Sequence, residues 1–228
     1  MPEKPLNEET YEYYISILKN DLSLALGCTE PGAVAYASAE ATTVLGRFPD
    51  RLDIKCSGNI IKNVKGVIVP NSGGLKGVDS AAVLGTLVGN TDKKLSILEN
   101  VEEKHIKKAS ALLKSEFCHV HLKEGEGSLY IEAIAKEKND TATVVIAGSH
   151  TNIVLIQYND KIILDNQTNR KTENGKNKNE NSNKNKTNLS INGILDFAKK
   201  ADIADLKCLL QLQLSVNTAI ADEGLRKP

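Results

Sequence analysis

The sequence is poor in aromatic residues and has no excess of charge of either sign. Phe, Tyr and Trp make up 4% of the 228 residues, and Trp is absent. Proteins that bind single-stranded nucleic acid usually stack bases on aromatic side chains, so this composition argues against that class. Lys and Arg number 29, and Asp and Glu also number 29, which gives a formal net charge of zero. We therefore expect no nucleic-acid partner, because nucleic-acid binding usually requires a basic surface.

Long hydrophobic runs and clustered cysteines are missing as well. The longest apolar runs, such as residues 143–147 and 153–156, fall far short of the roughly 20 residues that a membrane-spanning helix needs. The opening stretch MPEKPLNEETYEYY lacks the apolar segment of a signal peptide. The widely spaced cysteines contain no CxxC pair and do not indicate a disulfide framework; they are Cys28, Cys56, Cys118 and Cys208. We expect a cytoplasmic protein in a reducing compartment, with no membrane partner.

The apolar pattern predicts an α+β fold: an N-terminal helical pair, a small β region, an antiparallel β meander and C-terminal helices. Helical spacing covers residues 8–26 and 31–46, and Gly27 is expected to stop the first helix. The second helix is rich in small residues, which predicts close packing. Between residues 52 and 70, two β-prone runs flank a polar turn region at 57–63.

After residue 80, apolar residues recur first at helical spacing and then at every second position, as in strands. Helices are expected at residues 80–89 and 92–114. From residue 118 to 164 the period is two, which predicts consecutive antiparallel strands, the first pair joined by the EGEG turn. Two more helices are expected at 190–199 and 202–225.

One segment contains no apolar residue at all. Residues 165–188 read DNQTNRKTENGKNKNENSNKNKTN, and such a stretch cannot bury enough surface to offset its loss of entropy on ordering. We expect a disordered insertion there; a partner-binding segment is the alternative. The predicted domains are therefore an α+β domain at 1–164, the insertion at 165–188, and C-terminal helices at 189–228 that begin a truncated second half.

The segment LGCTEP, residues 26–31, contains the strongest candidate for chemistry. Cys28 lies just before the second expected helix, which Thr29 or Glu30 would cap and in which Pro31 occupies the first turn. Free N–H groups and the positive end of the helix dipole favour a thiolate there, able to act as base, nucleophile or metal ligand. The alternative is an inert cysteine that fills a junction between helices.

Two polar segments follow. SGNIIKN, residues 57–63, combines a hydroxyl, amides and an ammonium that suit the carboxylate of an amino acid; these side chains are Ser57, Asn59, Lys62 and Asn63. VPNSGGLKG, residues 69–77, contains Asn71 and Ser72 and could offer backbone N–H groups to an anion, but it lacks the glycine spacing of a dinucleotide site or P-loop. Ordinary turn chemistry is the alternative for both segments.

Histidines provide further candidates. His150, in the GSHTN segment between two expected strands, could act as a general acid or base or bind a substrate, or it could be a structural residue at a strand end. His119 and His121 share one face of a strand, but no third ligand is evident, so we expect no metal site within this chain.

Taken together and in order, LGCTEPGAVAYA, SGNIIKN, GVIVPNSGG, SHTN and the closing NTAIADEGL resemble the L-cysteine desulfidase family, a serine-dehydratase-like group of cytoplasmic iron–sulfur enzymes of amino-acid catabolism. The resemblance covers nearly the whole chain outside residues 165–188. It implies a lyase that converts L-cysteine to hydrogen sulfide, ammonia and pyruvate, with a [4Fe-4S] cluster as Lewis acid and Cys28 as the catalytic base. From chemistry and motif position we expect these substrate-binding residues: Thr29, Glu30, Ser57, Asn59, Lys62, Asn63, Asn71, Ser72 and His150.

The chain also departs from this family. Members carry their cluster-ligating cysteines in a following half, and Cys56, Cys118 and Cys208 do not match those positions. The implied cluster therefore has no ligands in this chain, and we expect a cluster-binding second half or subunit as partner, with no appreciable activity of the chain alone. An L-serine dehydratase subunit and a non-catalytic amino-acid-binding module are the alternatives, and the sequence does not choose between cysteine and serine as the small amino-acid substrate.

Overall fold

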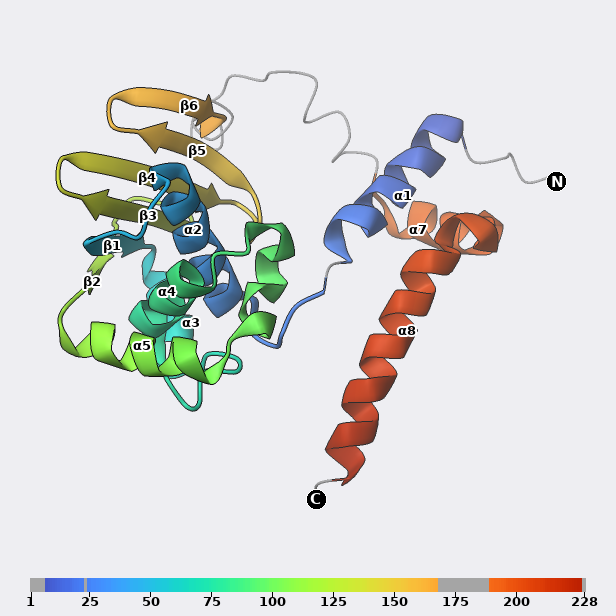
Figure 1. The fold of residues 1–228 in the computed structure, drawn as a ribbon. Helices are drawn as coiled ribbons and strands as arrows, with labels where there is room; N and C mark the ends of the chain where they lie inside the picture. Colours follow the sequence, from blue (N-terminus) through green and yellow to red (C-terminus); the bar gives the residue numbers. More distant parts are fainter. Residues whose placement is uncertain (1–6, 23, 168–188, 227–228) are drawn as a thin grey trace, which may run out of the picture. The chain divides into compact units, whose positions relative to one another are not determined.

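The computed structural model describes residues 7–22, 24–167 and 189–226, and it has the expected α+β class (Figure 1). The chain divides into two compact units. Residues 24–173 form one, which we call the sheet unit, and residues 1–23 with 174–228 form the other, which we call the helical unit. No helix in the described part of the chain is both long enough and apolar enough to cross a membrane.

The sheet unit is built on a six-stranded mixed sheet in the order β2-β1-β3-β4-β5-β6. The strands are β1 (Arg51–Cys56), β2 (Cys118–Leu122), β3 (Tyr130–Glu137), β4 (Asp140–Ala147), β5 (Ile153–Tyr158) and β6 (Lys161–Asp165). The expected antiparallel meander exists from β3 to β6. The expected hairpin between β2 and β3 is wrong: β1 lies between them, parallel to β2 and antiparallel to β3. A parallel pair needs a long crossover, and the helices between β1 and β2 supply it.

Helices α2 (Thr29–Leu45) and α4 (Gly77–Val88) pack against each other at the centre of this unit. The expectation that the small residues of α2 allow close packing is confirmed, because a Cβ added to Gly85 would collide with the backbone of Ala35. Gly32 is similarly close to the next element, since a Cβ there would lie 2.9 Å from the carbonyl oxygen of Leu95. Small side chains thus set the distance between helix backbones in this core.

The polar turn expected at residues 57–63 is instead a short helix, α3 (Gly58–Val64). Its helical period places Ile60 and Val64, four residues apart, on one buried face. The second β-prone run, GVIVP, makes only an isolated bridge between Ile68 and Lys76. The single helix expected at 92–114 is two elements, a 3-10 helix η1 (Thr91–Asn100) and α5 (Glu103–Lys114).

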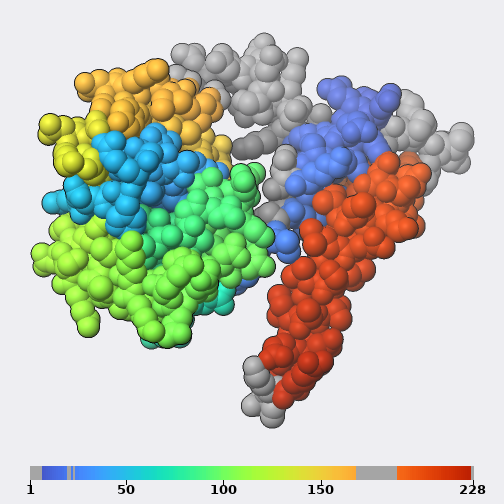
Figure 2. All heavy atoms as spheres, in the orientation of Figure 1, coloured from blue at the N-terminus to red at the C-terminus, as the bar shows by residue number. Residues whose placement is uncertain are grey.

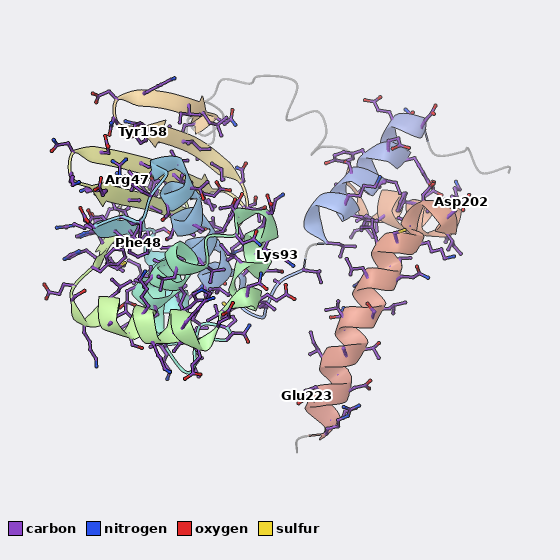
Figure 3. All side chains as sticks on the ribbon, viewed as in Figure 1. Arg47, Phe48, Lys93, Tyr158, Asp202 and Glu223 are labelled. Atoms are coloured by element: carbon purple, nitrogen blue, oxygen red, sulfur yellow. The ribbon has the colours of Figure 1, made fainter. Side chains whose placement is uncertain are left out.

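The helical unit contains α1 (Glu8–Asp21), α7 (Ile191–Lys200) and α8 (Ile203–Arg226), which confirms the two C-terminal helices. Its small core is formed by Tyr14, Ile15 and Phe197, with the Tyr14 and Phe197 rings stacked at 5.2 Å. Figure 3 shows Asp202 at the corner between α7 and α8 and Glu223 toward the far end of α8. Helix α1 ends at Asp21, earlier than expected; Gly27, with φ of 89°, lies in the segment before α2.

The expected disordered insertion lies largely outside the described residues. Within them, Asp165 ends β6, and the backbone N–H of Asn166 donates to the carbonyl of Val154 at 2.8 Å. Residues 168–188 are not described, so disorder in this segment stays a prediction.

Candidate functional site

Helix α2 begins in the Cys-Thr-Glu-Pro segment. Cys28 lies at the start of a helix, as expected. It is itself the N-cap residue, whereas Thr29 and Glu30, the expected caps, occupy the first turn. The Cys28 side chain makes no capping bond to the backbone of the helix. The backbone N–H of Glu30, in the first turn of α2, favours the ionised form of both the Glu30 carboxylate and the Cys28 thiol.

Glu30 is the centre of a hydrogen-bonded group that three separate elements supply. The thiol of Cys28 donates to Glu30 Oε2 at 2.8 Å, and Asn63 Nδ2 on α3 donates to Oε1 at 3.2 Å. The hydroxyl of Thr29 lies 3.5 Å from Oε2 and 3.2 Å from the Nε2 atom of His150, in the turn between β4 and β5. We call these five residues the Glu30 cluster.

The pKa shifts within the cluster contradict the expectation that Cys28 is a thiolate. The hydrogen bond from Cys28 lowers the pKa of Glu30, and Asn63 and the charge of His150 act in the same direction against partial burial. The pKa of Cys28 is raised, first by partial burial of the thiol and then by the Glu30 carboxylate. The backbone N–H of Glu30 favours the thiolate, but burial and the Glu30 side chain outweigh it, which leaves Cys28 a protonated donor.

The other expected site residues lie outside this cluster, and the side chains of three of them bond to backbone carbonyls elsewhere. Asn59 is exposed one turn before Asn63 on the same face of α3, and Lys62 is exposed beside them. Ser57 is buried and donates to the carbonyl of Ser128 at 2.7 Å.

The Asn71 side chain joins the glycine-rich loop to η1, and the Ser72 side chain bonds within the loop. Asn71 Nδ2 donates to the carbonyl of Leu98 at 3.0 Å, and the Ser72 hydroxyl donates to the carbonyl of Leu75 at 3.1 Å. No hydrogen bond joins either of these two side chains to the Glu30 cluster, and their contacts hold the glycine-rich loop against η1.

The cysteines present do not fit an iron–sulfur cluster. Cys56 on β1 is fully buried and Cys118 on β2 is partly buried, and burial raises the pKa of each thiol to about 12. Cys208 belongs to the helical unit and Cys28 to the sheet unit. Among residues 7–22, 24–167 and 189–226, no group of three His, Cys, Asp or Glu side chains could hold a metal ion.

Sequence reasoning missed a charged group on the sheet. Asp53 on β1 is almost fully buried, yet it accepts hydrogen bonds from Arg51 at 2.8 Å and from Lys136 at 2.8 Å. His119 and His121 lie 3.9 and 3.7 Å from its Oδ1 atom. Burial opposes ionisation of Asp53, but the two cations outweigh it and lower its pKa to about 2. The available signal was a carboxylate in an otherwise apolar strand position.

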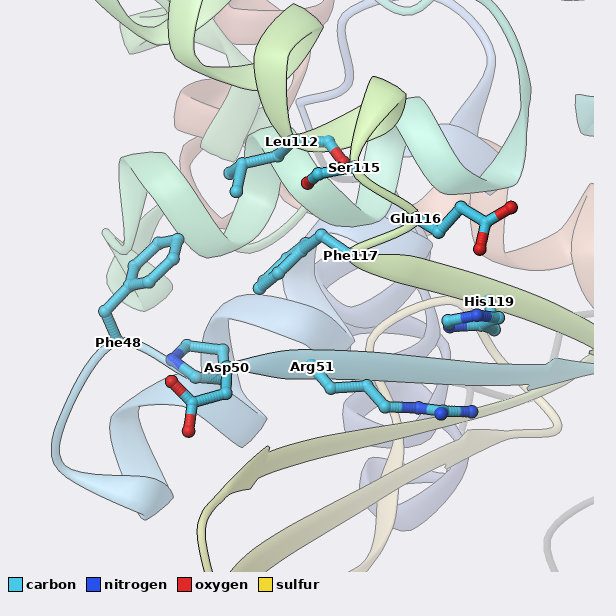
Figure 4. A pocket seen from close by; sticks show the side chains of 9 residues that line it. Phe48, Asp50, Arg51, Leu112, Ser115, Glu116, Phe117 and His119 are labelled. Atoms are coloured by element: carbon cyan, nitrogen blue, oxygen red, sulfur yellow. Dashed lines mark hydrogen bonds between the residues drawn. The ribbon is translucent and has the colours of Figure 1, made fainter.

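A surface pocket lies beside this group, between the start of β1 and the end of α5 (Figure 4). Phe48 and Phe117 stack at 5.6 Å on one side, with the Lys108 ammonium 4.3 Å from the centre of the Phe48 ring. Arg51 and His119 lie on the other side (Figure 4). None of the Glu30 cluster lines this pocket, and the only local signal was that two of the three Phe residues occur here.

Comparison with known proteins finds relatives that share one name. A UPF0597 protein of Finegoldia magna is 42% identical over 213 residues, covering 93% of this chain and 49% of its own length. A UPF0597 protein of Treponema denticola is 37% identical, covering 97% of this chain and 50% of its own length. A third, from Aliivibrio fischeri, is 34% identical over 219 residues. No family model and no solved structure matches the chain.

These relatives correct the expected family and function. They carry the UPF0597 name, which states no activity, and not a cysteine desulfidase or serine dehydratase name. The expected iron–sulfur lyase, and the description of this chain as part of one, are therefore not supported. The chain spans about half the length of the curated relatives it matches. It is similar, over nearly all of its residues, to one half of the UPF0597 proteins.

Proposed function

We propose that the Glu30 cluster binds a small amino acid. The observation that carries the proposal is a carboxylate with a lowered pKa, held at the start of α2, which accepts hydrogen bonds from Cys28 and Thr29 beside it and from Asn63 on α3. An ionised carboxylate of this kind accepts strong, charge-assisted hydrogen bonds from an ammonium group. Binding of an α-ammonium would replace the weak contact from the Cys28 thiol.

The carboxylate of the ligand would bind to side chains of α3. Asn63 already contacts Glu30, Asn59 lies one turn earlier on the same face, and the exposed Lys62 adds a cation. A site with one anion on α2 and one cation on α3 suits a zwitterion better than a simple anion or cation.

A second candidate is an enzyme that moves a proton at this site, and the 2.8 Å contact between the Cys28 thiol and Glu30 favours it. Thiol and carboxylate form a donor–acceptor pair, and His150 reaches them through Thr29, so the cluster contains groups able to give and accept protons. The free cysteines support placing this function in the reducing cytoplasm.

The test is calorimetric titration of the full chain with L-alanine, L-serine and L-cysteine, and with propionate, which lacks the ammonium. We expect the three amino acids to bind and propionate not to bind. Loss of a charged hydrogen bond costs about 1.5–3 kcal/mol, so Glu30→Gln should weaken binding by about 10- to 100-fold.

Glu124→Gln is the matched control, because Glu124 is an exposed acidic residue in the same unit and outside the cluster. Equal affinity for the Glu30→Gln variant and the wild type, or binding of propionate as tight as that of L-alanine, would contradict the proposal.

A further inference from the structure

Helix α8 carries a long uncharged stretch in an exposed position. Residues 208–221, CLLQLQLSVNTAIA, contain no Asp, Glu, Lys or Arg, and no residue of α8 is buried. Leu214 is 67% exposed and Ile220 is 64% exposed. Isolated exposed apolar residues are ordinary, but several of them repeated along successive turns of one helix indicate a site of interaction.

Helix geometry sorts most of these residues into two apolar stripes with polar residues between them on both sides. The first apolar stripe has the spacing i, i+3, i+7, i+11 and consists of Leu209, Leu212, Val216 and Ile220. The second has similar helical spacing and consists of Leu210, Leu214, Ala221 and Leu225. The wider polar side, which we call the polar stripe, consists of Gln211, Ser215, Thr218 and Asp222, and the narrow one contains Gln213 and Asn217.

The helical unit covers only the beginning of α8. Leu206 packs on the cluster formed by Tyr14 and Phe197, and Tyr11 donates a hydrogen bond to Asp205 at 2.7 Å. Along the later turns of α8, neither α1 nor α7 lies beside the helix (Figures 1 and 2). Among the described residues of this unit, neither helix therefore covers the apolar stripes along the later turns of α8.

We propose that both apolar stripes of α8 pack against a polypeptide that corresponds to the half of the UPF0597 relatives not matched by this chain. The relatives at 42% and 37% identity extend to about twice the matched length, so in those proteins a further segment of similar length is joined to the half that this chain matches. Two stripes on different sides of a helix require neighbours on two sides, as in the core of a larger domain.

A second copy of this chain fits the stripes less well. A two-fold pair of α8 helices is self-complementary and buries one stripe of each copy, leaving the other in water. The proposal commits to the unmatched half and is independent of the Glu30 cluster, which belongs to the other unit.

The test uses the full 228-residue chain and, as probe, the unmatched half of the Finegoldia magna relative, produced together with it. Cys208 is exposed and lies one helical turn before Leu212, so its alkylation reports whether α8 is covered. We expect the two polypeptides to copurify and the alkylation rate of Cys208 to fall by about tenfold or more.

Two variants and a matched control make the test specific to the stripes. Leu214→Glu and Ile220→Glu each place a charge where the partner should bury an apolar group, and each should weaken binding by about tenfold or more. Thr218→Glu introduces the same charge on the polar stripe and should leave binding within about twofold. All three positions are exposed, so the helicity of the variants should equal that of the wild type.

Several results would overturn the proposal. They are failure of the two polypeptides to bind, protection of Cys208 in the chain by itself, formation of a dimer that protects Cys208, and equal effects of the three substitutions. Protection in a dimer would assign the stripes to a second copy of this chain instead.

Discussion

Replacing Gly85 with alanine should break the closest helix contact in the sheet unit. The added methyl carbon would lie 2.6 Å from the carbonyl carbon of Ala35 and also meet the Cα and oxygen of that residue. Favourable carbon–carbon contacts lie at about 3.5–4.0 Å, so α2 and α4 would have to separate by roughly 1 Å. The obstacle is backbone, which cannot rotate aside as a side chain does.

The expected loss of stability is the balance of two effects. Overpacking of a rigid core costs about 1–3 kcal/mol or more, and the severity of this clash favours the upper end. Against this, alanine in place of glycine within a helix stabilises the folded state by about 1 kcal/mol. The net destabilisation should be about 2 kcal/mol or more, which corresponds to a fall in Tm of roughly 4–8 °C for a unit of this size.

The assay is thermal and urea unfolding followed by circular dichroism, with Gly66→Ala as control. Gly66 has no heavy atom within 4 Å of its added Cβ and no positive φ, so its substitution should be nearly neutral. Ala35→Gly should not rescue the Gly85 variant, because the clash is with backbone atoms. Stability of Gly85→Ala equal to or above that of the wild type would refute the packing argument.

Three further outcomes are expected. Glu30→Gln should lower the pKa of the Cys28 thiol, because it removes a carboxylate that helps to raise it, and mass spectrometry should then show faster alkylation of Cys28 at neutral pH. Asp53→Asn should reduce the free energy of unfolding by about 1–2 kcal/mol at pH 7. Because the pKa of Asp53 is lowered to about 2 in the folded protein, the wild type loses this advantage as the carboxylate is protonated. In urea unfolding, the difference between the two proteins should therefore shrink below about pH 4 and be lost near pH 2. Phe197→Ala should cost about 3 kcal/mol in the helical unit, measured as faster amide exchange in α1, with exchange in α2 unchanged.

Each of these has an outcome that would count against it. Unchanged Cys28 alkylation in the Glu30 variant, with Glu124→Gln as control, would remove the carboxylate as a cause. A stability difference for Asp53→Asn that persists at pH 2, or an equal loss in the exposed control Asp160→Asn, would show that its ion pairs are not responsible. Faster exchange in α2 as well as α1 would show that the two units unfold together.

Local patterns in the sequence were sufficient for much of the fold. The small residues of α2 predicted close helix packing, the period of two predicted β3 to β6, and the helical spacing after residue 189 predicted α7 and α8. These features depend on contacts between residues near one another in the chain, or on which face of an element is apolar. For the same reason, the place of Cys28 near a helix start could be anticipated from the Gly and Pro residues around it, although Thr29 or Glu30 was expected as the cap and Cys28 is the N-cap residue.

Other features depend on contacts between distant residues. The central place of β1 between β2 and β3 is a matter of strand pairing, which no local pattern contains. The segment at 57–63 looked like a turn because of its polar residues, but burial of Ile60 and Val64 on one face stabilises a helix there.

The protonation of Cys28 is the clearest case of a property that tertiary structure decided. From the sequence, a helix start favoured the thiolate, while Glu30, Asn63 and His150 were separate candidates. Folding brings α3 and the β4–β5 turn to the start of α2, and Glu30 becomes the anion that the helix end and the surrounding donors stabilise. Partial burial of the thiol raises its pKa, and the neighbouring Glu30 carboxylate raises it further, so the thiol keeps its proton. Residue types alone identified the participants, but the distances between them determined which one carries the charge.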